Sequence, residues 1–113
     1  MTLTQSLTQE VSTMEAELCS AFSDSTRILI LYSLGAQPRT VTDLTVELNI
    51  LQPTASRHLK ILRERGLVIA KRQGNSMLYT LTDRRLIDAL DILRSVLRDR
   101  IMHRANLNYE LNS

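Results

Sequence analysis

Apolar residues near the start of the chain recur every three or four positions and define the first expected element. They are Leu3, Leu7, Val11, Met14, Leu18 and Phe22. This period places their side chains on one stripe of an amphipathic helix, and the positions between them are mostly Thr, Gln, Ser and Glu. We therefore predict a helix over about residues 3–22.

The stretch "SDSTRILILYSLG" predicts a second helix. Ser23 or Asp24 can cap its N-terminus, and Gly35 can serve as the residue just beyond its C-terminus. The apolar run "ILILY" would suit a strand by propensity alone, but the caps lie about three helical turns apart and favour a helix.

A short helix is predicted over residues 42–48, followed by a tight turn. Thr40 or Thr42 can cap the helix, and Asn49-Ile50 can form the turn.

A longer helix is predicted from about Pro53 to Arg65. Proline suits the first helical position, and Gly66 can close the end. The apolar stripe of this helix comprises Ala55, Leu59 and Leu62, which leaves an outer face of polar and basic side chains: Gln52, Thr54, Ser56, Arg57, Lys60 and Arg63.

After Gly66 the pattern changes from a helical to a strand period. The segments "LVIAKR" and "MLYTL" are rich in β-branched and aromatic residues, and they flank "QGNS", where Gly74 and Asn75 can take φ > 0. A β-hairpin is therefore predicted over about residues 67–82.

A last helix is predicted over about residues 84–105. Its apolar seam consists of Leu86, Leu90, Leu93, Leu97 and Ile101, widened by Ile87, Val96 and Met102. One small domain does not need this much apolar surface, so the helix suggests a partner. The whole pattern predicts a mainly α fold with a two-stranded β-hairpin, in the order α-α-α-α-β-β-α, as a single domain over residues 1–113.

Composition narrows the class of protein. The chain has 113 residues, of which 43% are apolar and 23% charged, as is usual for one globular domain. The sequence contains neither an apolar stretch long enough to span a membrane nor a signal peptide, so we expect a cytoplasmic protein without a membrane partner. The single cysteine, Cys19, can supply neither an intramolecular disulfide nor the paired thiolates of a zinc finger.

Basic residues gather around the longer of the two central helices, although the net charge is only +2. Residues 52–72 carry six Lys or Arg against Glu64 alone, whereas residues 1–26 carry four Asp or Glu and no Lys or Arg. This distribution is typical of a surface that binds a polyanion, although an ordinary solvated basic face would look similar. Two helices, a tight turn and a basic hairpin describe a winged helix-turn-helix, in which a polar helix can enter the DNA major groove and the hairpin can reach the flanking backbone.

The chain also resembles the ArsR/SmtB family of bacterial and archaeal repressors. The matching segments are "AFSDSTRILILYSL", "VTDLTVELNILQPTASRHLKILRERGLV" and "RQGNSMLYTL", and "SRHLKILRERGLV" is the most specific part. The resemblance implies a homodimer that binds an imperfect inverted repeat of double-stranded DNA and leaves it when an inducer binds. It also implies that residues 3–22 and 84–105 form the dimer interface, with the helix-turn-helix over about 42–65 and the wing over about 67–82.

The resemblance implies specific DNA-binding residues. On the recognition helix these are Gln52, Thr54, Ser56, Arg57 and His58; on the wing the candidates are Arg72, Asn75 and Ser76. Gln52 can pair with adenine, whereas Arg57 and Lys60 are expected to bind phosphate, with guanine as an alternative for Arg57. His58 could equally support the helix from its inner flank. Tyr79 is expected to lie in the core.

One position departs from the family pattern. The residue before Gln52 is commonly Ser or Thr, which caps the recognition helix, and here it is Leu51. The cap is then left to Gln52, to water or to a bound phosphate oxygen, and loss of an ordinary cap costs about 1 kcal/mol.

No cofactor and no standard metal site is expected, and the sequence does not identify an inducer. The segment Val41–Thr45 has no cysteine, and the acidic and histidine residues of the last helix do not follow the family's spacing. A solvated His103 is favoured over an atypical metal site that joins it to Asp99 or Glu110. Cys19 is expected to be a small core residue, and the alternative is a redox-responsive repressor that acts through it.

Nothing in the sequence resembles a catalytic constellation, so we expect no enzyme. The predicted function is a sequence-specific DNA-binding transcriptional regulator, an inducer-released repressor without the usual metal sites. A winged helix that binds a protein in place of DNA is the alternative, and the polar, basic outer face of residues 52–63 argues against it.

Overall fold

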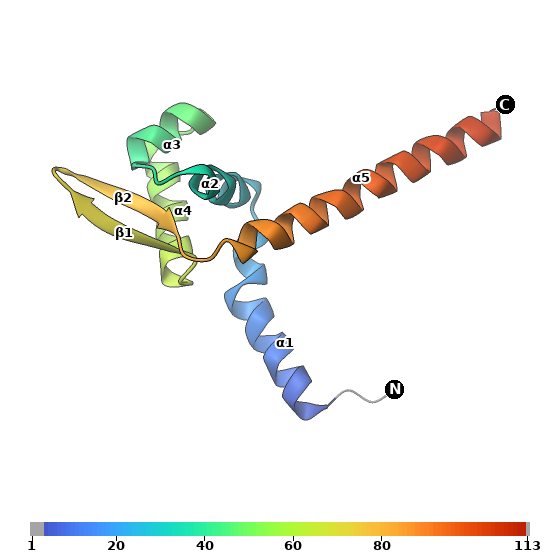
Figure 1. Cartoon of the computed structure of the whole chain (residues 1–113), viewed down its shortest axis with the longest axis horizontal. Coiled ribbons are helices and arrows are strands. Elements are labelled where there is room, and N and C mark those ends of the chain that lie inside the picture. Colours follow the sequence, from blue (N-terminus) through green and yellow to red (C-terminus); the bar gives the residue numbers. More distant parts are fainter. Residues whose placement is uncertain (1–3, 113) are drawn as a thin grey trace. The chain divides into compact units, whose positions relative to one another are not determined.

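The computed structural model describes residues 4–112 and divides into two compact units after Asp83. Within these residues the first unit holds four α-helices, a 3-10 helix and a two-stranded sheet, and the second unit is one helix (Figure 1). Leu3, with which the first helix was expected to begin, lies outside the described residues. These elements confirm a mainly α fold with a two-stranded hairpin, while a single domain over residues 1–113 stays a prediction.

The first helix, α1, spans Gln5–Glu17 and ends earlier than predicted. The hydroxyl of Thr4 caps it by accepting a hydrogen bond from the amide of Leu7 at 3.1 Å. After Leu18 the chain continues as a 3-10 helix, η1, over Cys19–Phe22. The prediction of one continuous helix to residue 22 was therefore wrong.

A cluster of hydrogen bonds on one carbonyl accounts for this break. The carbonyl oxygen of Ala16 accepts from the hydroxyl of Ser20 at 2.7 Å and also from the guanidinium of Arg65. The hydroxyls of Thr8 and Thr13 make the same bond to the carbonyl four residues back inside α1 without ending it. The added donor from Arg65 therefore distinguishes the Ala16 carbonyl, where it competes with the helical bond from the amide of Ser20. Arg65 also donates to the Ser20 hydroxyl, which ties η1 to the end of the fourth helix.

The second helix, α2, spans Ser25–Ala36 and begins at the expected cap. The carboxylate of Asp24 accepts from the amides of Thr26 and Arg27 at 2.8 and 3.2 Å. The role predicted for Gly35 was wrong, because this residue lies inside the helix. The chain leaves α2 at Gln37 with φ −167°, an extended conformation that needs no glycine.

The third and fourth helices form the predicted helix-turn-helix. Helix α3 spans Val41–Leu48 and is capped reciprocally by Thr40 and Asp43; Asn49 then turns the chain with φ 53°. Helix α4 spans Gln52–Glu64 and is closed by Gly66, whose φ of 74° is left-handed, as predicted for a helix-ending glycine.

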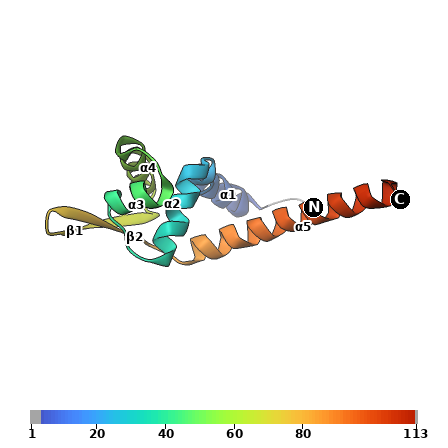
Figure 2. The same ribbon diagram turned by 90° about the horizontal axis from the view of Figure 1, so that it is seen from above.

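The hairpin pairs β1, Val68–Gln73, with β2, Ser76–Leu81, in antiparallel register. Gly74 alone of the two turn residues has a positive φ, which is the pattern of a type II′ turn with glycine first. On the outer side of β2, the backbone of Tyr79 exchanges two hydrogen bonds with that of Arg39, at 3.0 and 2.8 Å. Figures 1 and 2 both show the hairpin projecting from the helices of this unit.

Arg39 also joins α2 to α3 through its side chain. Its guanidinium lies 3.0 Å from the carboxylate of Glu47, and that carboxylate accepts from the buried hydroxyl of Ser33 at 2.9 Å. The segment between α2 and α3 is thereby held both to the helices and to the wing.

The core of the first unit lies between α2, α3, α4 and the start of β1. Its fully buried side chains are Ile30, Leu31, Leu44, Leu59, Leu62 and Val68. Leu59 and Leu62 come from the predicted apolar stripe of α4, so this stripe orients the helix and leaves its opposite face to solvent.

The second unit is the helix α5, Arg85–Asn112, which is longer than the predicted span of 84–105. Many large apolar side chains along it are exposed: Ile92, Leu93, Val96, Leu97, Ile101, Met102, Leu107 and Leu111. None of the helices within residues 4–112 combines the length and the apolar content needed to cross a bilayer.

Candidate nucleic-acid interface

Helix α4 presents most of the predicted DNA-binding side chains on its solvent face. Gln52, Ser56, Arg57 and Lys60 are exposed, and Thr54 is half-buried. Short polar side chains near the start of a helix, with basic side chains further along it, are the residue types that read and flank a DNA major groove.

The positive charges on this face are not neutralised by the protein itself. Within residues 4–112, Arg57, Lys60 and Arg63 have neither an ion-pair nor a hydrogen-bond partner for their side chains. The guanidinium of Arg65, by contrast, donates hydrogen bonds to the carbonyl of Ala16 and the hydroxyl of Ser20. Free cations on one helix face can therefore bind an external anion without breaking an internal contact.

The N-terminus of α4 lacks a side-chain cap, as the sequence predicted. Leu51 has the extended backbone of an N-cap residue, φ −70° and ψ 148°, but no acceptor in its side chain, which is 75% exposed. Pro53 has no amide hydrogen, so helix geometry leaves the amides of Gln52 and Thr54 without an intrahelical acceptor. These two amides can therefore donate to water or to a bound ligand at the N-terminus of α4.

His58 lies on the inner flank of α4 and not on its solvent face. It is 5% exposed, with its Nδ1 atom 3.3 Å from a guanidinium nitrogen of Arg27 and its Nε2 atom 3.8 Å from the carboxylate of Asp24. The expectation that His58 contacts DNA is therefore corrected to the alternative, that it supports the helix. The sequence held a signal for this, because Ala55, His58, Leu59 and Leu62 follow the spacing of a single helical stripe.

Burial dominates the protonation of His58. It lowers the pKa of the imidazole; the nearby Asp24 carboxylate opposes this effect, and the Arg27 and Arg57 guanidinium groups add to it. The pKa of Asp24 itself is lowered, mainly because its carboxylate accepts the hydrogen bond from the Arg27 amide. The cluster thus joins α4 to the start of α2 through a neutral imidazole and an ionised carboxylate.

The wing candidates lie at the outer end of the hairpin. Arg72, Asn75 and Ser76 are all exposed, next to the Gly74 turn. Tyr79, which was expected in the core, is half-buried instead, because the β2 register directs it toward α4.

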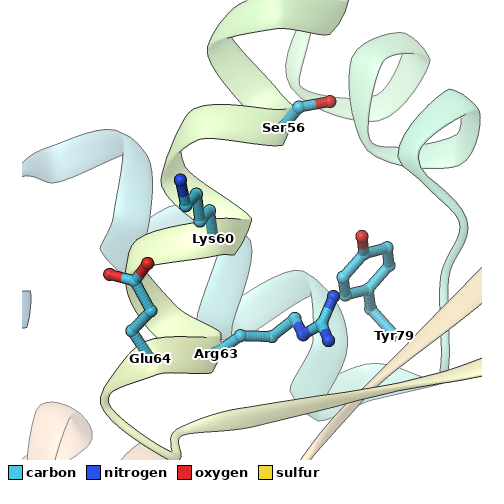
Figure 3. Close-up of a pocket in the computed structure, with 5 residues that line it drawn as sticks. All are labelled: Ser56, Lys60, Arg63, Glu64 and Tyr79. Atoms are coloured by element: carbon cyan, nitrogen blue, oxygen red, sulfur yellow. The ribbon is translucent and has the colours of Figure 1, made fainter.

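A hollow of about 510 Å³ lies between α4 and β2 (Figure 3). It is lined by Ser56, Lys60, Arg63, Glu64 and Tyr79. The sequence placed Ser56 and Lys60 in the site but missed Arg63 and Tyr79. The one available signal was that Arg63 follows Lys60 by three positions and so shares its face of the helix.

Cys19 is exposed, which corrects its expected place in the core. The apolar stripe with which it was grouped is exposed too, at Leu7, Val11 and Met14, so this stripe forms no core within one chain. Among the described residues, no three His, Cys, Asp or Glu side chains gather as metal ligands.

Comparison with known proteins places this geometry among bacterial regulators. The family model described as "Bacterial regulatory protein, arsR family" matches residues 24–70. The HTH-type transcriptional repressor SmtB of Mycobacterium tuberculosis is 37% identical over 78 residues, which cover 69% of this chain and 58% of that protein. This chain thus spans less than two thirds of that relative's length. The HTH-type transcriptional regulator NmtR of the same organism is 34% identical over 85 residues, 75% of this chain and 71% of NmtR.

Solved structures agree with the fold. The crystal structure of M. tuberculosis Rv0081 superimposes with a TM-score of 0.74 at 28% identity and covers 84% of this chain and 96% of its own. The crystal structure of NolR from Sinorhizobium fredii has a TM-score of 0.72 at 26% identity, and the match covers 85% of this chain and 96% of NolR. The homodimeric winged helix-turn-helix domain of Mb0332 from Mycobacterium bovis has a TM-score of 0.74 at 22% identity, and the match covers 91% of this chain and 95% of that domain. At this identity the match shows the shared fold alone.

Proposed function

The chain belongs to the arsR family of bacterial regulatory proteins, and on this premise we propose that it is a non-enzymatic transcriptional regulator that represses by binding double-stranded DNA. The observation that carries the proposal is the exposed face of α4, on which Arg57 and Lys60 have no partner among the described residues. Repressors among the relatives, such as SmtB, support the same direction of control.

Within this proposal the residues of α4 have distinct tasks. Gln52 and Ser56 contact base edges, Thr54 contacts a base or a phosphate, and Arg57 and Lys60 contact the backbone, with Arg72, Asn75 and Ser76 of the wing on the flanking strand. The uncapped amides of Gln52 and Thr54 are suited to a backbone phosphate oxygen.

A binding titration tests this proposal. Fluorescence anisotropy with duplex DNA from upstream of the protein's own operon should show specific binding that weakens with salt. Arg57→Ala and Lys60→Ala should each weaken it about 5- to 30-fold and reduce the slope of log K against log salt by about 1. Arg98→Ala, which removes one positive charge from an exposed position of α5 beside the apolar stripe, is the matched control. Equal losses in all three variants would mean that net charge and not contact is measured.

We also propose that the chain is a homodimer formed through α1 and α5. Both helices leave apolar stripes exposed, including Leu7, Val11 and Met14 on α1 and Leu97 and Ile101 on α5. A two-fold axis would present two copies of α4 to half-sites about 34 Å apart, hence an imperfect inverted repeat. Leu97→Glu should yield a monomer by light scattering, whereas Arg98→Glu, at a neighbouring exposed position, should remain a dimer.

Relief of repression requires a signal that releases the DNA, and the exposed Cys19 keeps a thiol oxidant as a second candidate beside an unidentified inducer. Thiols are oxidised where they are accessible. If Cys19 is the sensor, peroxide should release DNA from the wild type but not from Cys19→Ser. Release from both proteins, or from neither, would remove this candidate.

A further inference from the structure

The hollow between α4 and β2 gathers polar groups that have no partner in the protein. Within residues 4–112, the ammonium of Lys60, the guanidinium of Arg63 and the hydroxyl of Tyr79 take part in no hydrogen bond or ion pair. All three line the same hollow, together with Ser56. Lys60 and Arg63 are exposed and hydrated in the free protein, so an external anion can replace that water without breaking an internal contact.

The chemistry of the lining selects an anion with several oxygens. Two cations and two hydroxyls surround the space, and a guanidinium matches the paired oxygens of a phosphate. Glu64 is the opposing charge. Figure 3 shows the Arg63 guanidinium directed toward Tyr79, whereas the Glu64 carboxylate and the Lys60 ammonium lie toward the other side of α4, so Lys60 must rotate to reach a ligand beside Arg63.

Both walls of the hollow are fixed by the fold. Ser56, Lys60 and Arg63 follow one another by four and three positions on α4, so they share one face of a helix held by its buried stripe. Tyr79 stands on β2 between two backbone partners, Ala70 of β1 and Arg39. The fold therefore fixes the backbone positions of these groups, and a ligand has only to order the exposed side chains of Lys60 and Arg63.

The size and openness of the hollow suit one unit of a polymer. Its volume of about 510 Å³ falls in the range of small-molecule sites, about 300–1,000 Å³, and exceeds what a bare phosphate fills. All its lining residues except Tyr79 are exposed, so the hollow is open to solvent and one unit of a long chain can reach it from outside.

We propose that this hollow, which we call the phosphate pocket, binds a phosphate group through Arg63, Lys60 and Tyr79, and that in the DNA complex the group is a backbone phosphate of the strand that passes between the recognition helix and the wing. The inference rests on the proposed function. It adds Arg63 and Tyr79 to the interface and gives them a sequence-independent task. A free phosphate-bearing metabolite has the same chemistry and would compete with DNA for the pocket.

Anisotropy titrations of the full chain test the pocket, with an operator duplex and a random-sequence duplex between about 50 and 200 mM salt. Arg63→Gln should weaken binding to both duplexes by the same factor, about 5- to 10-fold, and lower the salt slope by about 0.9. Tyr79→Phe removes only a hydroxyl and should weaken both about 3-fold without changing the slope. Arg98→Gln, which removes one positive charge from an exposed position of α5 outside the hollow, is the matched control and should leave the slope unchanged.

A second arm distinguishes the two sources of phosphate. Inorganic pyrophosphate, added at constant ionic strength, should displace DNA from the wild type more effectively than from Arg63→Gln if the pocket also takes a free phosphate. Equal displacement assigns the pocket to the DNA backbone alone, provided that Arg63→Gln lowers the salt slope.

The proposal is overturned if wild type binds DNA and Arg63→Gln and Tyr79→Phe, folded by circular dichroism, bind both duplexes with wild-type affinity and slope. Failure of the wild type to bind any duplex would instead refute the proposed function. The two failures are therefore distinguishable.

Discussion

Replacing Leu51 by serine would give α4 the side-chain cap that it lacks. The backbone of Leu51 already has N-cap dihedral angles, φ −70° and ψ 148°, so a serine there needs no rearrangement of the chain. Its hydroxyl would accept from the amide of Thr54, because Pro53 has no hydrogen to donate.

Two terms determine the expected change in stability. A serine at an N-cap stabilises a helix by about 1 kcal/mol relative to alanine. Leu51 is 75% exposed, so removal of its side chain loses about a quarter of the roughly 1.5–3 kcal/mol that full burial would contribute, or about 0.6 kcal/mol. Leu51→Ser should thus be slightly more stable than wild type, and Leu51→Ala should be less stable than Leu51→Ser by about 1 kcal/mol.

Comparison of the serine and alanine variants isolates the cap, because both lose the same leucine contacts. Urea unfolding at one fixed protein concentration should give a higher midpoint for Leu51→Ser than for Leu51→Ala, and thermal midpoints should differ by about 4 °C. Equal midpoints would refute the reasoning, since they would mean that solvent already satisfies the first turn of α4 at no cost.

Three further predictions concern the scaffold that holds α4 and the wing. Acidification from about pH 7.5 to 5.5 should lower the free energy of unfolding: burial lowers the pKa of His58 in the folded chain, so the unfolded chain takes up the proton first, near its usual value of about 6.5, and the loss continues down to the folded pKa. In urea titrations the free energy of unfolding should depend less on pH in His58→Gln than in the control His103→Gln. Identical pH profiles would contradict this role of His58. Asp24, whose pKa is lowered, contributes a loss of stability only below about pH 4. Gly66→Ala should cost about 1–2 kcal/mol in urea unfolding through its φ of 74° alone, because an added Cβ meets nothing within 4 Å, and Gly66→Asn should cost less. Arg39→Met should cost about 1 kcal/mol because it leaves Glu47 without its ion pair, and a change within error would show that Ser33 and solvent satisfy that carboxylate.

Local hydrogen bonding explains which elements the sequence could predict. Asp24, Thr40 and Gly66 act on amides or carbonyls only a few residues away, so their roles follow from neighbouring letters and were confirmed. Gly35 was misassigned because Gln37 leaves α2 in an extended conformation that leads to pairing with β2. That pairing joins residues about forty positions apart, and no local pattern reports it.

The residues of the candidate site also fall into those that local patterns predict and those that long-range contacts place. The exposed side chains of α4 could be listed from the 3.6-residue period, which depends on the chain alone. The place of His58 required Asp24 and Arg27, more than thirty positions earlier, and Arg63 entered the site only because the hairpin register brings Tyr79 opposite it.

Short-range patterns were enough to predict the helices of the helix-turn-helix, the hairpin, the missing cap at Leu51 and the basic face, because caps, turns and periodic burial are set by interactions over a few residues. The three-dimensional arrangement was needed to show that α1 ends at Glu17, that His58 is buried, that Cys19 is exposed and that α4 and β2 enclose a hollow. Each of these depends on contacts such as that of Arg65 with Ala16, in which a side chain meets a distant part of the chain and its gain in packing or hydrogen bonding overrides local preference.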